Sequence, residues 1–391
     1  MSKKKLFFPK NFLWGTATSA HQVEGGNIWN DWHLFEQAGK IANKEISGVA
    51  CNQYQLFKDD FDLAKALGQN AHRISVEWSR IEKMEGVFDE KEIKHYIDVL
   101  KYLKKSGFTT FVTLHHFTSP IWFIEKGGWE KKESINYFVR YAKFVTDNLG
   151  EYVDFWSTFN EPYGPYATQG WLQGNWPPEK RNPILMFVVL SNIAKSHNST
   201  YEAIKKIDKN YKVGIVSNNG ILHMNRVLKP FEKIANYFIN FLLLDKVIAK
   251  CDYLGLNHYF SGSDLKNKGI TLRNDINWPI NPQAFYDTIM LISKRYPDLP
   301  IYITENGIAD NKDAKREKFI HDNLIMLHKS IFDGADVRGY FHWSLIDNFE
   351  WKYGFFPRFG LVEIDYKTQK RIPRPSAFYY KNICKTNTIE V

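Results

Sequence analysis

Residues 12–26 read FLWGTATSAHQVEGG, and this stretch decides between two folds. It opens with a short apolar run at 12–16 that has the length and composition of a buried strand. In an open doubly wound sheet, the first strand leads into a glycine-rich phosphate-binding turn of the form GxGxxG. Here the strand leads instead into polar residues, among them His21, Gln22 and Glu24, with no GxGxxG. The stretch therefore favours a closed barrel over a nucleotide-binding sheet.

The rest of the chain repeats this opening: a short apolar run, then a longer segment with the periodicity of a helix. The runs predict eight strands, at residues 12–16, 71–76, 109–114, 154–159, 212–217, 253–257, 300–304 and 339–344. The segments predict helices at residues 54–67, 90–105, 134–149, 184–207, 230–249, 281–295, 314–332 and 376–383. Strands that alternate with helices are typical of right-handed βαβ units, and eight pairs predict an α/β fold of the (β/α)₈ TIM-barrel type. No linker or low-complexity tract divides the chain, so we interpret residues 1–391 as one barrel domain.

Charge and cysteine content exclude several classes of protein. The net charge of +9 comes from lysines scattered among acids, a pattern typical of a solvated surface and not of a nucleic-acid-binding face. Three widely spaced cysteines form no CxxC pair and no apolar leader follows the basic residues 3–5, so we expect a reduced, cytoplasmic protein. The most apolar helical segment, 234–244, is too short to span a membrane. We expect a small-molecule substrate and neither nucleic acid nor membrane as a partner, and the sequence leaves a homo-oligomer open.

Polar and aromatic side chains follow almost every predicted strand. Because the active sites of barrels lie where strands end and loops begin, these positions are the candidates for chemistry. They are His21, Gln22, Glu24, Arg73, His115, His116, Phe117, Asn160, Glu161, Asn257, His258, Tyr259, Glu305, Asn306, Trp343, Asp347, Asn348, Glu350 and Trp351. The chain is 16% aromatic, and aromatic faces stack on ligands such as sugars. Asn218 and Asn219 follow the fifth strand, and the sequence assigns them no role.

Two glutamates stand out among these candidates. Glu161 lies in TFNEP and Glu305 in ITENG, each directly after a predicted buried strand and beside a turn residue. Two carboxyl groups across a barrel mouth suit the cleavage of a glycosidic bond, where one protonates the leaving oxygen and the other attacks or stabilises the sugar carbon. The alternative for either glutamate alone is an acid at the start of a helix that offsets the helix dipole. Because two such glutamates occur together with polar and aromatic residues at strand ends, we favour a catalytic role over that alternative.

These motifs resemble glycoside hydrolase family 1, the family of β-glucosidases and β-galactosidases with a TIM-barrel fold. The resemblance extends over nearly the whole chain through FLWGTATSAHQVEG, RISVEWSRI, TLHH, TFNEP, NHY, ITENG, WSLIDNFEW and RFGLVEIDY, in that order. It implies that Glu161 is the acid/base and Glu305 the nucleophile of a retaining double displacement on β-glucosides, with β-galactosides and β-fucosides as related substrates. It further implies that Arg73 and Tyr259 support the nucleophile. The substrate-binding residues it implies are Gln22, His116, Asn160, Trp343, Glu350 and Trp351.

We expect no metal and no cofactor. His115 and His116 are adjacent at a strand end and point to opposite faces, so they do not reach one ion together. The sequence has no HExxH, and residues 310–313 lack the glycine and the final glutamate of a calcium loop.

Two departures from the family pattern concern the substrate. Phe117 stands where the family often has Trp, so an indole N–H that would contact a sugar hydroxyl is missing. The chain is also short between predicted strands 5 and 7, where about 35 residues separate Ser217 from Tyr253. We expect these shortened loops to leave the cleft more open on the leaving-group side.

Other functions remain as alternatives at this point. A 6-phospho-β-glucosidase is disfavoured because Glu350 would repel a phosphate dianion and no Ser–Lys–Tyr set follows it. A non-catalytic sugar-binding relative is disfavoured because both glutamates are present. A thioglucosidase that dispenses with its acid is disfavoured by Glu161.

Overall fold

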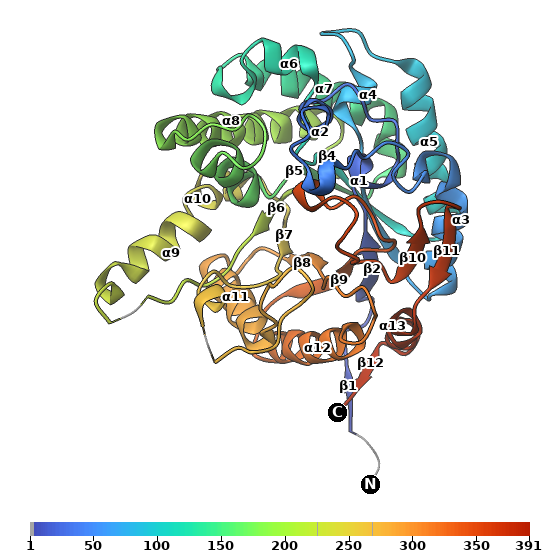
Figure 1. Ribbon diagram of the computed structural model, residues 1–391, viewed down its shortest axis with the longest axis vertical. Coiled ribbons are helices and arrows are strands. Elements are labelled where there is room, and N and C mark those ends of the chain that lie inside the picture. Colours follow the sequence, from blue (N-terminus) through green and yellow to red (C-terminus); the bar gives the residue numbers. More distant parts are fainter. Residues whose placement is uncertain (1–3, 225, 268) are drawn as a thin grey trace.

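The computed structural model describes residues 4–224, 226–267 and 269–391, and its centre is a closed barrel of eight parallel strands (Figure 1). The strands follow chain order around the barrel. They are β2 (Leu13–Ala17), β3 (Ala71–Ser75), β4 (Thr109–His115), β5 (Phe155–Asn160), β6 (Lys212–Asn218), β7 (Tyr253–Asn257), β8 (Ile301–Asn306) and β9 (Val337–Trp343). Each lies within three residues of a predicted strand, and the TIM barrel is confirmed.

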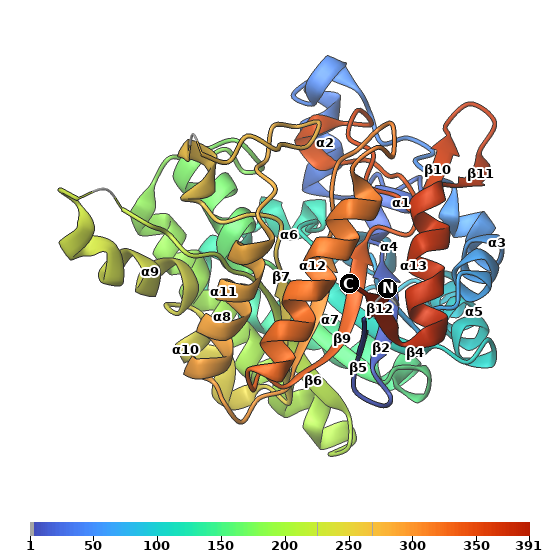
Figure 2. The same ribbon diagram turned by 90° about the horizontal axis from the view of Figure 1, so that it is seen from below.

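Helices surround the barrel, and most of those predicted are present (Figures 1 and 2). The longer ones are α3 (Gln53–Ala66), α5 (Glu90–Lys105), α7 (Ser134–Leu149), α8 (Pro183–Ile207), α11 (Pro282–Arg295), α12 (Arg316–Phe332) and α13 (Pro375–Thr386). Short helices α1 (Ala20–Val23), α2 (Asp31–Gln37), α4 (Trp78–Ile81) and α6 (Ile121–Glu125) lie in the loops near the barrel mouth. The start of α5 shows how local sequence sets a boundary: the Asp89 side chain accepts hydrogen bonds from the backbone N–H groups of Lys91 and Glu92.

The helix predicted at 230–249 is the exception, because it is broken into α9 (Glu232–Asn240), α10 (Leu244–Val247) and the 3₁₀ turn η6 (Ile248–Lys250). The break falls at Phe241, whose φ of −120° leaves the helical region. Beyond it the chain turns inward and buries Leu244 and Val247 against the barrel layer, whereas α9 projects outward from the molecule (Figures 1 and 2). Burial of the second apolar cluster therefore overrides helical continuity.

Aromatic side chains fill the interior of the barrel at the end where the strands begin. Phe111, Tyr253, Tyr302 and Phe341 form a buried cluster there, and the rings of Phe111 and Phe155 stack with centroids 4.2 Å apart. Small residues on neighbouring strands make room for these rings. A Cβ added to Gly15 would lie 2.7 Å from the Phe341 ring, and one added to Gly214 would lie 2.8 Å from the Tyr253 ring. The interior is thus a packed core, and open space begins only above it.

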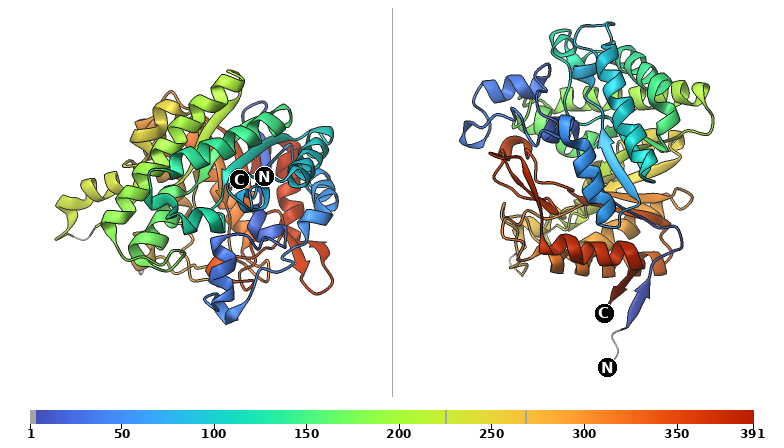
Figure 3. Two further views of the ribbon diagram at one scale, coloured as in Figure 1. Left: turned by 90° about the horizontal axis from the view of Figure 1, so that it is seen from above. Right: turned by 90° about the vertical axis from the view of Figure 1, so that its right-hand side faces the viewer.

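Two small sheets complete the fold. The terminal strands β1 (Lys5–Phe7) and β12 (Thr388–Glu390) pair antiparallel, so the two ends of the chain lie side by side (Figure 3). The hairpin of β10 (Val362–Asp365) and β11 (Lys370–Pro373) follows the last barrel strand. Among the described residues, no helix combines the length and apolar character needed to cross a membrane.

Candidate active site

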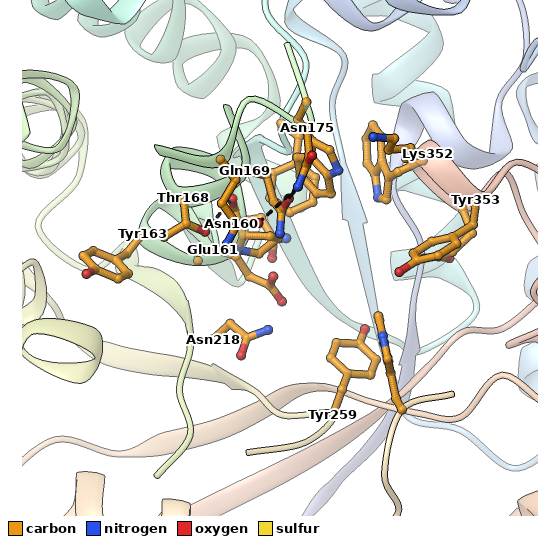
Figure 4. A pocket seen from close by; sticks show the side chains of 18 of the residues that line it. Asn160, Glu161, Tyr163, Thr168, Gln169, Asn175, Asn218, Tyr259, Lys352 and Tyr353 are labelled. Carbon is orange, nitrogen blue, oxygen red and sulfur yellow. Dashed lines mark hydrogen bonds between the residues drawn. The ribbon is translucent and has the colours of Figure 1, made fainter. Parts of the chain in front are cut away.

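A cavity of about 1050 Å³ opens where the barrel strands end (Figure 4). Nine of the ten predicted site residues line it: Gln22, His116, Asn160, Glu161, Tyr259, Glu305, Trp343, Glu350 and Trp351. The tenth, Arg73, lies in β3 behind the cavity wall with 1% of its surface exposed. The barrel therefore gathers residues from distant parts of the chain into one site.

The two glutamates have different surroundings. Glu305 lies in β8, where its Oε1 is paired with Nη1 of Arg73 and its Oε2 accepts a hydrogen bond of 2.7 Å from the Tyr259 hydroxyl. Glu161 follows β5 in the left-handed region (φ 42°, ψ 52°) at the start of the π-helical segment η4 (Pro162–Gln173). Among the described residues, Glu161 has no salt bridge. The cation at Glu305 stabilises its carboxylate form, and Glu161 has no such partner.

A chain of hydrogen bonds joins the two glutamates and fixes which group donates at each link. Arg73 only donates, and its Nη2 lies 2.7 Å from Asn160 Oδ1. The same oxygen accepts from Asn257 Nδ2 at 3.2 Å, and this amide nitrogen also donates to Glu161 Oε1 at 2.6 Å. The Thr304 hydroxyl donates to Asn257 Oδ1 at 2.7 Å and holds that amide in this orientation. Oε1 of Glu161 is thus an acceptor, which leaves Oε2 to carry a proton.

The same reasoning sets the state of His116. Because Asn160 Oδ1 is occupied by donors, the Asn160 amide nitrogen must donate to His116 Nε2, 3.2 Å away. The ring proton then lies on Nδ1, which has no hydrogen-bond partner among the described residues. Burial, reinforced by the charge of Arg73, holds the pKa of His116 well below its usual value. His116 is therefore a neutral side chain with one donor.

Two carboxyl groups in the cavity have raised pKa values. Burial, followed by the charge of Glu305, raises the pKa of Glu161 to about 8, against hydrogen bonds from Asn257 and Asn218. The same two causes raise the pKa of Glu350 to about 8, against hydrogen bonds from Trp343 and Gln22. Glu161 is therefore largely protonated at neutral pH.

The part of the cavity beside β2 and β9 is lined by an ordered polar cluster. Gln22 Nε2 donates to Asn348 Oδ1 and to the Phe349 carbonyl, each at 2.9 Å, and lies 3.3 Å from Glu350 Oε2. The Ser19 hydroxyl donates to Gln22 Oε1 at 2.6 Å. These bonds hold the Gln22 amide and the Glu350 carboxyl in fixed orientations at the cavity surface.

Flat rings form the wall next to this cluster. His116 lies nearly parallel to Trp343 and to Trp351, with interplanar angles of 22° and 13° and ring centroids 6.1 Å apart in both pairs. Phe117 has a φ of 74°, which turns its ring toward Trp176 and Trp351, each 5.1 Å away. Aromatic faces and hydrogen-bonding groups together match a ligand with apolar faces and a polar rim, as a sugar ring has.

Some residues at strand ends serve the fold instead of the cavity. Asp347 is paired with Arg374 at 2.9 Å, and Glu24 accepts a hydrogen bond of 2.8 Å from Tyr96. His115 points into the helical layer, where it packs near Phe138 of α7, while its neighbour His116 faces the cavity. The opposite orientation predicted for the two histidines is confirmed.

Three residues near Glu161 were missed or left without a role by sequence reasoning. Asn257 and Thr304 form the link described above, and Asn218 lines the cavity near Glu161 (Figure 4) and acts to lower the pKa of Glu161. Asn257 opens the NHY motif, which is the only sequence signal for any of them. The amides act through contacts between residues far apart in the chain, and no local pattern reports such contacts.

Comparisons with known proteins identify the family of the chain. The model of the family described as "Glycosyl hydrolase family 1" matches residues 4–226 and 257–389. Beta-glucosidase A of Thermotoga maritima is 31% identical over alignments that cover 100% of both chains. A solved structure of a beta-glycosidase from Pyrococcus horikoshii is 39% identical, with a TM-score of 0.92 over 99% of this chain and 97% of its own. The Thermotoga maritima beta-glucosidase in complex with glucoimidazole has a TM-score of 0.91 at 30% identity, over 97% of this chain and 99% of its own.

Proposed function

The chain belongs to glycosyl hydrolase family 1, and from that premise we propose how its barrel mouth performs the reaction. The protein is a β-glucosidase-type glycoside hydrolase. We assign the acid/base role to Glu161 and the nucleophile role to Glu305, in a double displacement with retention. The observation that carries this assignment is the contrast between them: Arg73 forms an ion pair with Glu305 and Tyr259 donates a hydrogen bond to it, whereas burial raises the pKa of Glu161 to about 8.

In the first step, the Glu305 carboxylate attacks the anomeric carbon while Glu161 gives its proton to the leaving oxygen. The C–O bond to the aglycone breaks and an ester bond between sugar and Glu305 forms. In the second step, Glu161, now a carboxylate, accepts a proton from a water molecule, and the oxygen of that water attacks the anomeric carbon. Glu305 leaves as a carboxylate next to Arg73, and Glu161 is protonated again, so the enzyme returns to its starting state.

We place the sugar ring at the ordered end of the cavity. Gln22 and Glu350 would bind its outer hydroxyls, and Glu350 both donates and accepts while it is protonated. Asn160 and His116 would bind hydroxyls near the reacting carbon, and the hydrogen bond of Asn160 to the 2-hydroxyl would strengthen in the transition state. Trp343 and Trp351 would offer their faces to the ring.

The first prediction concerns the sugar that is cleaved. We expect turnover of 4-nitrophenyl β-D-glucoside, β-D-galactoside and β-D-fucoside. For the 6-phospho-β-glucoside, kcat/KM should be on the order of a hundredfold lower, because a phosphate dianion would have to lose its hydration against the ordered Gln22–Glu350 cluster. The measurement is the release of nitrophenolate across the panel at pH 6.5. A preference for the phosphorylated sugar would overturn the proposed binding of an unmodified glucoside.

The second prediction is a pH dependence set by Glu161. The protonated form is the active acid, so kcat/KM should be constant below about pH 8 on this limb and fall about tenfold per unit above it. Asn257→Leu removes a donor that stabilises the Glu161 carboxylate, and the pKa should rise further. The basic limb should therefore move about one unit to higher pH, with kcat/KM lowered about tenfold by the lost positioning.

Two control variants identify the group that titrates. Glu350→Gln removes the other carboxyl with a pKa near 8, and the basic limb should remain in place. Tyr259→Phe removes the hydrogen bond to Glu305 and should lower kcat/KM without moving the basic limb. A basic limb that disappears in Glu350→Gln would show that Glu350, and not Glu161, controls it.

We also propose a reducing, cytoplasmic location. Its support is that Cys51, Cys251 and Cys384 are all unpaired, and that burial raises the pKa of each thiol above its usual value, which disfavours the reactive thiolate.

A further inference from the structure

Trp351 lines the sugar end of the cavity on a strained backbone, and we propose that buried His21 is the positioning residue that holds its indole in place. The inference rests on the proposed function, because it deepens the assignment of Trp351 as a sugar-binding ring. Trp351 has a φ of 52°, in the left-handed region, and 5% of its surface is exposed. A bulky residue keeps such a backbone conformation only where its surroundings hold it there. The packing around the indole therefore decides where its face lies.

His21 stacks on this indole from outside the cavity. The two ring planes differ by 9° and the ring centroids lie 5.7 Å apart, as in offset stacking. Trp32 and Phe117 also pack against Trp351, with centroids 4.7 and 5.1 Å away, but their planes are inclined by 53° and 68°. A parallel ring contacts the indole over its face and opposes a change in tilt more than an inclined ring does. His21 is 1% exposed and is not among the described residues that line the cavity, so it would act on a sugar through Trp351.

The His21 ring is itself held at both nitrogens. Its Nε2 lies 2.8 Å from Glu36 Oε1, and its Nδ1 lies 3.1 Å from Asn30 Nδ2. Asn30 Oδ1 already accepts from the backbone N–H of His33 at 2.8 Å, at the start of α2. The Asn30 amide therefore donates to His21 Nδ1, and the ring proton lies on Nε2, which donates to Glu36. Both hydrogen bonds would be lost if the ring turned, so the plane of His21 is fixed.

Glu36 is fixed in turn by a third segment of the chain. Its Oε2 accepts hydrogen bonds from the backbone N–H and from the hydroxyl of Ser47, both at 2.8 Å. Against burial, the hydrogen bonds from His21 and Ser47 lower the pKa of Glu36, so the group is a carboxylate and accepts at both oxygens. Ser47, Glu36 and His21 thus form a continuous line of contacts that ends on the face of Trp351.

Helix α1 connects this line to the polar cluster of the sugar end. Gln22 follows His21 directly and lines the cavity, whereas His21 points toward α2. The Gln22 side chain donates to the Phe349 carbonyl at 2.9 Å, and the Phe349 N–H donates to the Gln22 carbonyl at 3.1 Å. The amide contacts of Gln22 therefore do not depend on the His21 ring. Removing that ring should disturb the indole of Trp351 and leave the Gln22 cluster in place.

Two variants of one position separate the ring from its hydrogen bond. His21→Phe keeps a flat ring beside Trp351 but leaves the buried Glu36 carboxylate without a donor, so it should have the lower Tm. His21→Gln keeps a donor for Glu36 but has no ring. The measurements are Tm and the Ki of methyl 1-thio-β-D-glucoside against 4-nitrophenyl β-glucoside hydrolysis. We expect Ki to stay within about threefold of the unaltered enzyme in His21→Phe and to rise about tenfold in His21→Gln.

A merely structural role predicts the opposite order, with the weaker binding in the less stable variant. That order, or an unchanged Ki in a folded His21→Gln protein, would overturn the inference. Should both variants fail to fold, Ser47→Ala removes one hydrogen bond to Glu36 and should raise Ki about threefold. An unchanged Ki in Ser47→Ala would then count against the line of contacts.

A double-mutant cycle shows whether the effect passes through the indole. Trp351→Ala alone should raise Ki about thirtyfold, and adding His21→Gln to it should raise Ki less than about twofold further. His72→Gln is the matched control, because His72 is also a buried histidine directly before a site residue, but its ring packs against Phe61 at 5.0 Å. It should lower Tm without changing Ki. A tenfold rise on adding His21→Gln to Trp351→Ala would refute the positioning role.

The same cycle separates this inference from the proposed function. An unchanged Ki in a folded Trp351→Ala protein would overturn the assignment of Trp351 to the sugar, and the positioning role with it. Weaker binding in Trp351→Ala together with an unchanged Ki in His21→Gln would overturn only the positioning role.

Discussion

Replacing Glu305 with glycine is expected to lower kcat/KM for 4-nitrophenyl β-D-glucoside by about 10⁵-fold, because no group remains to form the bond to the anomeric carbon. The change also removes the carboxylate between Arg73 and Tyr259 and leaves a space with a cation at its edge. Azide would be attracted to this space and would attack from the face that Glu305 occupied. One displacement inverts the configuration, so the expected product is the α-glucosyl azide. Nitrophenolate release and NMR of the azide product are the two measurements.

Loss of activity in this variant needs a control for folding. Glu305 is 3% exposed and is the salt-bridge partner of Arg73, and removing one partner of a buried ion pair costs about 3–5 kcal/mol of stability. Thermal unfolding and the binding of methyl 1-thio-β-glucoside show whether the site is intact. Glu305→Gln keeps the shape of the side chain and should be as inactive as the glycine variant. Turnover within tenfold of the unaltered enzyme in a folded Glu305→Gly protein would contradict the nucleophile assignment.

The barrel was predictable because its strands differ from their surroundings in two ways. All five residues of β7 and all six of β8 are buried, so each strand begins as an apolar run instead of an alternating one. Polar and helical segments bound each run, and the sixth predicted strand, 253–257, has the bounds of β7. Parallel barrel strands are covered on both faces, and this burial is visible in the sequence.

Elements that depend on distant contacts were not predictable in the same way. The segment 230–249 has helical periodicity throughout, yet it breaks at Phe241, where burial of the following apolar residues outweighs continuation of the helix. The strands β1 and β12 are three residues long and pair across nearly the whole chain. No local pattern distinguishes such short segments from loops.

The residues of the candidate site also fall into two groups, those found in local sequence motifs and those that depend on distant contacts. Glu161 and Glu305 stand in short motifs at strand ends, and the sequence identifies them as candidates. The hydrogen bonds that influence the protonation of Glu161 come from side chains that meet only in the folded protein. Thr304 donates to Asn257, and Asn257 donates to Glu161, 96 positions away in the sequence. Asparagine and threonine have many roles in proteins, so their identity alone does not reveal this link.

Replacing Glu161 with alanine is expected to have an effect that depends on the leaving group. Substrates with poor leaving groups, such as alkyl glucosides, need a proton in the first step, so their kcat/KM should fall by about 10²–10⁴-fold. The dinitrophenolate of a 2,4-dinitrophenyl glucoside leaves without a proton, so kcat/KM for this substrate should stay within about tenfold of that of the unaltered enzyme. The second step still needs a base to activate water, so kcat should fall and the sugar should accumulate on Glu305. Mass spectrometry of the intact protein measures this adduct.

Azide distinguishes the two glutamates by the stereochemistry of its product. In Glu161→Ala, the space beside Asn257 and Asn218 lies on the face from which water would attack. Azide needs no general base, so it should restore kcat for the dinitrophenyl substrate. It would displace Glu305 from the glycosyl-enzyme, and two inversions give the β-glucosyl azide, opposite to the α product expected from Glu305→Gly. The α product from Glu161→Ala would show that the space left by Glu161 lies on the nucleophile's face, and an equal loss on all leaving groups without rescue would show that another group donates the proton. Either outcome would contradict the acid/base assignment.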